Sequence, residues 1–142
     1  MIETKGTYNS HSSLKLRPAP AGWMELRLVR VGMSLVALAR AEGEGRWQVR
    51  DRWYRMENDP RMQVGLIAYT TSGDVAPGHE DAERINLAVE REARTDMQME
   101  VDWLRFTRPV LAAQPDWYAQ VSANPLAGAA LSDAQVLALI GE

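Results

Sequence analysis

Two aromatic residues and their basic neighbours could form a surface that binds a ligand. Trp53 and Tyr54 are flanked by Arg50, Arg52 and Arg55. Sugar rings stack on the flat faces of such aromatic side chains, and the arginines indicate that one face of the segment is exposed. The pattern predicts a ligand-binding site at Trp53, Tyr54, Arg50 and Arg52.

The other aromatic residues are divided between core and surface. Tryptophans at strand spacing usually fill a hydrophobic core, and this interpretation is favoured for Trp23, Trp47 and Trp103. Further candidates for stacking on a sugar are Tyr69, Trp117 and Tyr118.

A basic segment and an acidic segment lie next to each other in the chain. The basic one holds the arginines at 46, 50, 52, 55 and 61, and the acidic one runs from Asp74 to Asp102. The basic segment could line a groove for an anion or an acidic sugar. Mutual neutralisation across a sheet or at a subunit contact is the favoured interpretation, and surface pairs of this kind contribute little stability.

Metal and cofactor chemistry has weak support. Asp74, His79, Glu80 and Asp81 could cluster in one loop, and calcium would accept their oxygens, but a solvated loop is favoured. The second histidine, His11, has no partner at metal-site spacing. No phosphate-binding loop, dinucleotide motif or nucleophile elbow is present, so no cofactor and no metal are predicted.

Composition limits the class of protein. The 142 residues favour one domain plus a tail, and a net charge of -3 argues against nucleic acid as a partner. Cysteine is absent, so packing alone must hold the fold. No apolar run approaches the roughly 20 residues that cross a bilayer, and the first residues do not resemble a signal peptide. We expect a chain that is not in a membrane and is cytoplasmic as written.

The fold is organised around a predicted hairpin in residues 23–39. Met24, Leu26 and Leu28 alternate with residues that point the other way, as a half-buried strand requires. Gly32 permits the positive φ of a tight turn, and a second alternating run follows.

Further strands are predicted on both sides of this hairpin. They cover residues 3–8, 13–17, 46–56, 61–71 and 97–108, and Pro18 and Pro20 mark a loop. Residues 81–94 fit a short helix or an extended segment.

The last residues predict a short helix at about 133–140. Ser132 is placed as N-cap with Gln135 as its partner in a capping box, and Leu131 and Val136 are placed as a hydrophobic staple. Gly141 is a plausible stop. The apolar residues of this helix require a surface that covers them.

Several segments follow one another in an order that resembles the second half of concanavalin A-like lectin and glucanase domains. They are residues 23–30, Gly32, Ala37, Glu42-Gly43, Trp47, residues 63–68 and residues 101–106. The resemblance implies a jelly-roll β-sandwich with sugar-binding ancestry. Glu42 stands where that family has aspartate, and only about 22 residues precede the first of these strands.

Glucanases of this family carry the acidic pattern E-x-D-x-x-E on one strand. Glu100 and Asp102 match its first two positions, but Arg105 replaces the last glutamate. One carboxylate of the required set is therefore missing, and no catalytic residue is assigned.

These observations predict an all-β fold, an antiparallel jelly-roll-like sandwich that is shortened at its N-terminus, over residues 1–110. Residues 111–142 are expected to form a C-terminal tail with the helix. The first function expected is non-catalytic, lectin-like recognition of an oligosaccharide. The alternative is a protein-interaction or assembly domain that uses an exposed sheet face and the C-terminal helix, and glycosidase activity is the third. Because a shortened sandwich leaves apolar surface or a sheet edge open, we expect a homodimer or a higher assembly.

Overall fold

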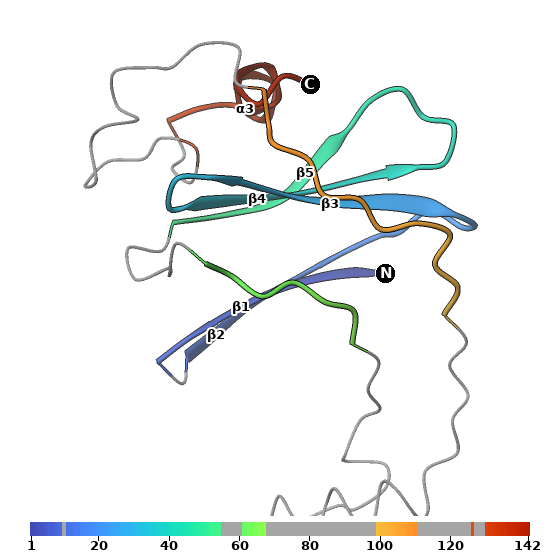
Figure 1. Cartoon of the computed structure of the whole chain (residues 1–142), viewed down its shortest axis with the longest axis horizontal. Coiled ribbons are helices and arrows are strands. Elements are labelled where there is room, and N and C mark those ends of the chain that lie inside the picture. Colours follow the sequence, from blue (N-terminus) through green and yellow to red (C-terminus); the bar gives the residue numbers. More distant parts are fainter. Residues whose placement is uncertain (10, 55–60, 68–98, 111–125, 127–129) are drawn as a thin grey trace, which may run out of the picture. The chain divides into compact units, whose positions relative to one another are not determined.

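The computed structural model describes residues 1–9, 11–54, 61–67, 99–110, 126 and 130–142 (Figure 1). The elements in these residues are β1 (Ile2–Tyr8), β2 (His11–Arg17), β3 (Met24–Val31), β4 (Ser34–Ala41), β5 (Gln48–Tyr54) and α3 (Asp133–Leu139). The chain divides into two units, one of residues 1–61 and 107–142 and one of residues 62–106. All the elements above belong to the first unit, whose described residues are mostly strand with one short C-terminal helix.

The strands form two antiparallel sheets. β1 pairs with β2 in one sheet, and the order of the other sheet is β3-β4-β5. The predicted central hairpin is confirmed, because Val31 lies opposite Ser34 and Gly32 adopts a φ of 58° in the turn between them. A positive φ of this kind suits glycine, which has no Cβ to clash. The strands predicted at residues 3–8, 13–17 and 46–56 are also present.

A β-bulge changes which side chains of β5 share a face. Leu38 lies opposite Val49, but its neighbour Ala37 lies opposite Asp51, so Arg50 is the extra residue. Val49 therefore lies on the face of Leu38, whereas Trp53, two residues after Asp51, lies on the other face. Regular alternation along residues 46–56 of the sequence predicts that Val49 and Trp53 share a side, and this prediction is wrong because of the bulge.

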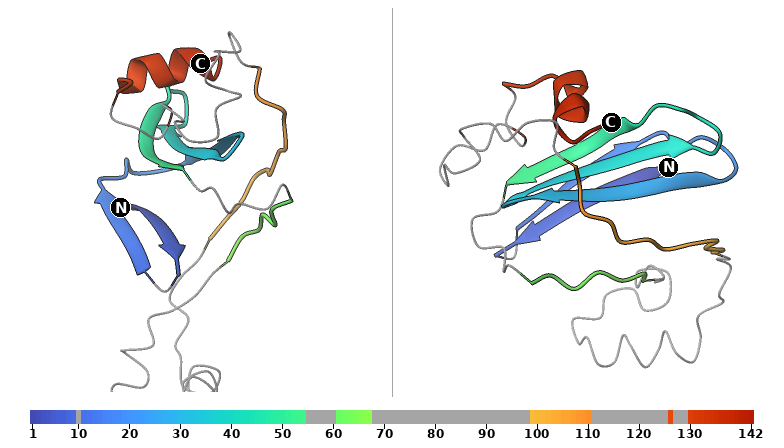
Figure 2. Two further views of the ribbon diagram at one scale, coloured as in Figure 1. Left: turned by 90° about the vertical axis from the view of Figure 1, so that its left-hand side faces the viewer. Right: turned by 45° about the horizontal axis from the view of Figure 1, so that its top comes forward.

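Helix α3 covers one face of the three-stranded sheet and completes the core (Figure 2). Val29, Val36 and Leu38 of the sheet are buried together with Val136 and Ile140. The predicted capping box is confirmed, since Ser132 Oγ accepts from Gln135 N and Gln135 Oε1 accepts from Ser132 N. The predicted need of this helix for an apolar partner is met by the sheet.

The C-terminal end of α3 also fixes a second segment of the first unit. Gly141 has a φ of 82°, and a Cβ built on it would lie 2.5 Å from the carbonyl oxygen of Val110. Only glycine accommodates both the backbone conformation and this close approach. Residues 107–110 and α3 thus belong to the same unit, while the predicted domain boundary at residue 110 stays a prediction.

The described residues of the second unit, 62–67 and 99–106, contain no helix and no strand. The strands predicted at 61–71 and 97–108 are therefore not formed in their described parts. Alternating apolar residues make a strand possible, but a strand also requires a neighbour that satisfies its backbone hydrogen bonds. The undecided segment 81–94 lies outside the described residues.

The tryptophans predicted for the core have different outcomes. Trp47 is buried within the core of the first unit, as expected. Trp23 is 49% exposed and Trp103 is 50% exposed, so the core interpretation is wrong for both. Trp23 lies just before β3, and Trp103 lies in a described segment that forms no strand.

Candidate functional site

The four predicted ligand-binding residues all lie on β5, but they do not share one face. Tyr54 lies opposite Ser34, whereas Trp53 lies opposite Leu35, the next residue of β4. Successive residues of a strand point to opposite faces, so the rings of Trp53 and Tyr54 belong to different sides of the sheet. They do not form a single stacking platform.

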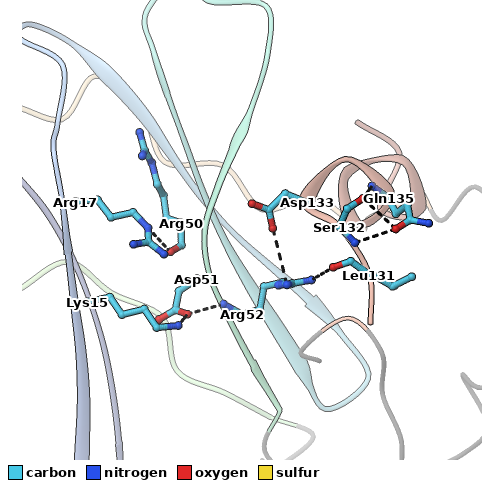
Figure 3. A network of polar contacts seen from close by, with 9 residues as sticks. All are labelled: Lys15, Arg17, Arg50, Asp51, Arg52, Leu131, Ser132, Asp133 and Gln135. Carbon is cyan, nitrogen blue, oxygen red and sulfur yellow. Dashed lines mark hydrogen bonds and ion pairs between the residues drawn. The ribbon is translucent and has the colours of Figure 1, made fainter. Parts of the chain in front are cut away.

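Arg52 is used to hold the start of α3. Its Nη1 donates to the carbonyl oxygen of Leu131 at 2.9 Å, and its Nη2 lies 3.9 Å from Asp133 Oδ1 (Figure 3). Leu131 precedes the N-cap and Asp133 is the first residue of the helix. The charged group of Arg52 therefore has partners at the start of α3, and its role is explained without a ligand.

Arg50 and Tyr54 also have partners within the protein. The carbonyl oxygen of Arg50 accepts from Arg17 Nε at 2.8 Å, and Tyr54 Oη lies 3.9 Å from Met33 Sδ. The Nε of Arg50 is buried, and no described group bonds to it. Arg17 thereby joins β2 to the bulge of β5.

The most enclosed charged group of the described chain is the carboxylate of Asp51, whose side chain is 2% exposed. It accepts from Thr4 Oγ1 at 3.1 Å. It also accepts from the backbone N of Arg52 at 2.8 Å and forms an ion pair with Lys15 Nζ (Figure 3). Burying a charge is costly unless it is paired and hydrogen-bonded, and Asp51 meets both conditions. The contacts fasten β1 and β2 to β5.

Sequence reasoning missed this group. The available signal was a single aspartate in the middle of a predicted strand, where carboxylates are uncommon.

A second charged cluster surrounds the ring of Trp47. The guanidinium of Arg40 lies 4.3 Å from the ring centroid and that of Arg27 lies 5.8 Å from it. Glu25 binds Arg40 through two hydrogen bonds of 3.0 and 2.9 Å, and Glu142 forms an ion pair with Arg27. The hydrogen bond to Glu25 raises the pKa of Arg40, and the charged guanidinium stacks on the ring as a cation–π contact.

A small cavity of about 180 Å³ lies next to this cluster. It is lined by Gly45, Arg46, Trp47, Ala134, Leu137 and Glu142. Trp47 is only 8% exposed and Arg40 stacks on its ring, so little of the ring surface is accessible from the cavity. The cavity therefore does not supply an aromatic platform for a sugar.

The sheet face opposite α3 carries exposed leucines. Val29 lies in the core, and its neighbours Leu28 and Leu26 alternate with the residues that face the helix. Leu28 is 55% exposed and Leu26 is 64% exposed. β3 is also a terminal strand of its sheet, with β4 as its one neighbour among the described residues. Within the part of the chain that the structure describes, an apolar face and a sheet edge therefore meet at this strand.

The remaining predicted site residues give no catalytic or metal centre. Glu100 and Asp102 are exposed and lie in no strand, so they do not align on one strand face. The described residues hold no group of three histidines or carboxylates that could bind a metal, and no described helix could cross a membrane. The loop from Asp74 to Asp81 and the aromatic residues Tyr69, Trp117 and Tyr118 lie outside the described residues.

Comparison with family models, with curated proteins and with solved structures gives no match for this chain. The resemblance to concanavalin A-like domains therefore stays a prediction from the sequence.

Proposed function

We propose that this protein is an assembly module, which binds a second copy of itself through the surface at β3. The observation that carries the proposal is the exposure of Leu26 and Leu28 on the sheet face opposite α3. Single exposed leucines are ordinary, but here two lie on the same face of one terminal strand. Apolar surface of this kind at a sheet edge favours association.

Contact between the apolar side chains of two copies would favour association. Full burial of a leucine side chain contributes about 1.5–3 kcal/mol relative to full exposure. Leu26 is 64% exposed and Leu28 is 55% exposed, so each side chain would gain only a fraction of this amount. A symmetric contact uses each residue twice, and part of the gain offsets the entropy lost on association.

Recognition of an oligosaccharide remains the alternative function. The structure places Trp53 and Tyr54 on different faces and uses Arg52 to bind α3. These placements give the alternative less support than the assembly function has. A glycan array distinguishes the two, because a folded protein that binds no glycan but self-associates is an assembly module.

We also propose that the fold is a jelly-roll-like sandwich that is shortened at its N-terminus. In the first unit α3 covers one face of the β3-β4-β5 sheet, and the opposite face carries the exposed leucines. A second copy that pairs with β3 would continue this sheet and bring the apolar residues of both copies into lateral contact.

The test is the molar mass in solution of the full chain, measured by sedimentation velocity or light scattering over a wide concentration range. We expect the mass of a dimer at high concentration, and a shift towards monomer in Leu26→Lys. Ala138→Lys is the matched control, because it adds the same charge at an exposed position of α3. The wild-type protein running as a monomer at every concentration would overturn the proposal.

A further inference from the structure

We propose that two copies join through their β3 strands, paired antiparallel about a two-fold axis that brings Leu26 of one copy opposite Leu26 of the other. This inference rests on the proposed assembly function and specifies its geometry. It follows from the hydrogen-bonding direction of β3, from the signs of its charges and from the placement of its leucines.

The backbone of β3 restricts how a second strand can pair with it. Val31 and Ser34 close a two-residue turn and therefore form a hydrogen-bonded pair. Because such pairs alternate in an antiparallel ladder, the odd-numbered residues of β3 direct their N–H and C=O groups to β4. The even-numbered residues direct theirs away from β4. A second strand must therefore hydrogen-bond to even-numbered residues such as Met24, Leu26 and Leu28.

A symmetric antiparallel pair of β3 strands then has few registers. Even-numbered residues of one copy must lie opposite even-numbered residues of the other. Each register is named after the residue that lies opposite its own copy at the two-fold axis. The register centred on Glu25 places two glutamates opposite each other, and the one centred on Arg27 does the same with two arginines. Like charges directly opposite each other are destabilising, so both registers are disfavoured.

The register centred on Leu26 has the best match of charges. It places Glu25 of each copy opposite Arg27 of the other, in a close pair that is not hydrogen-bonded, with Cα atoms about 4.5 Å apart. The register centred on Leu28 instead opposes Arg27 to Val29 and Leu26 to Arg30. Only the first of these two makes unlike charges meet, and it does so twice.

Ion pairs within each copy continue the pairing of unlike charges between the copies. Glu25 already binds Arg40, and Arg27 already binds Glu142. The pairing creates a row of alternating charge, from Arg40 and Glu25 of one copy to Arg27 and Glu142 of the other. On the opposite face, Leu26 meets its own copy and Leu28 meets Met24. The apolar residues of both copies then form one continuous surface.

Cysteine crosslinking tests the register directly, because the chain contains no cysteine of its own. In Leu26→Cys the two sulfur-bearing residues lie opposite each other at a Cα separation of about 5.5 Å, within the range of a disulfide. We expect this variant to form a disulfide-linked dimer under mild oxidation. Leu28→Cys is the control, since its two copies would lie four residues apart, about 14 Å along the strands.

Charge exchange is the second test. Glu25→Lys should weaken dimerisation by roughly 2- to 30-fold, through the loss of two cross-strand pairs. Adding Arg27→Glu should recover most of the lost affinity. The double variant still lacks the contacts of the wild-type chain with Arg40 and Glu142, so recovery can come only from the pair between copies.

The outcomes separate the register from the assembly function. A wild-type dimer whose Leu28→Cys variant crosslinks while Leu26→Cys does not would overturn this register. A wild-type dimer in which neither variant crosslinks would overturn β3 pairing and leave the assembly function standing. A wild-type chain that is monomeric throughout would overturn both.

Discussion

Ser34 is fully buried at the start of β4, and its Oγ has no hydrogen-bond partner in the described part of the protein. A hydroxyl that loses water without gaining a partner destabilises the fold. We expect Ser34→Ala to raise the free energy of unfolding by about 1 kcal/mol, measured by urea denaturation. Ser12→Ala is the control, because Ser12 Oγ is exposed and bonded to Thr7 Oγ1, and we expect almost no change there. A clear loss of stability in Ser34→Ala would mean that the hydroxyl is bonded in solution.

Asp51 is the opposite case, a buried carboxylate whose partners are in place. Replacing it with alanine leaves Thr4 Oγ1 and Arg52 N without their acceptor. We expect Asp51→Ala to lower the free energy of unfolding by about 1–3 kcal/mol. Asp133→Ala removes an exposed carboxylate that faces Arg52, and its effect should stay under about 1 kcal/mol. Equal effects of the two substitutions in urea denaturation would contradict the buried role of Asp51.

For single residues, the sequence identifies candidate side chains but does not predict on which face of the sheet each one lies. The aromatic and basic residues of β5 are evident from the sequence, but the bulge at Arg50 depends on pairing with β4. One extra residue moves Trp53 to the face opposite Val49, which separates the candidate ligand residues. The burial of Trp47 follows from its place between the sheet and α3, and strand spacing alone predicts the same burial, wrongly, for Trp23.

At the scale of elements, α3 depends on its first turn because it is only seven residues long. A helix of this length is marginal by itself and is held by its cap and by packing on the sheet. We expect Ser132→Ala to cost about 0.5–2 kcal/mol of stability, since the N-cap side chain no longer accepts from Gln135 N. Ser132→Asp keeps an acceptor at that position and should retain most of the stability. If both variants lose the same amount in thermal denaturation, the cap does not contribute as described.

The elements that sequence analysis predicts correctly carry their own local signals. The β3–β4 hairpin has alternating apolar residues and a glycine in its turn, and α3 has a complete capping box. Residues 62–67 and 99–106 have alternation but no strand in the structure. Strand formation requires a partner strand, and alternation within one segment does not specify that partner.

For the whole molecule, the two faces of the β3-β4-β5 sheet differ in how they are covered. One face is closed by α3 and contains fully buried residues such as Val36 and Val136. The other face carries Leu26 and Leu28, and the contacts of Asp51 with Thr4 and Lys15 fasten the first hairpin on the side of β5. The exposed leucines lie on β3, at the other end of the strand order. This asymmetry is the observation that supports the proposed association at β3.

Under the proposed assembly function, association of folded copies would make the stability of the protein depend on its concentration. The β3 surface would form only in the folded chain, so dimerisation would stabilise the folded state by mass action. A tenfold rise in protein concentration should add about 1.4 kcal/mol per dimer, and the midpoint of thermal unfolding should increase accordingly. In Leu26→Lys the midpoint should be independent of concentration, while Ala138→Lys should behave as the wild type. A wild-type midpoint that does not change over two orders of magnitude in concentration would exclude a dimer coupled to folding, and the leucines of β3 would then need another occupant.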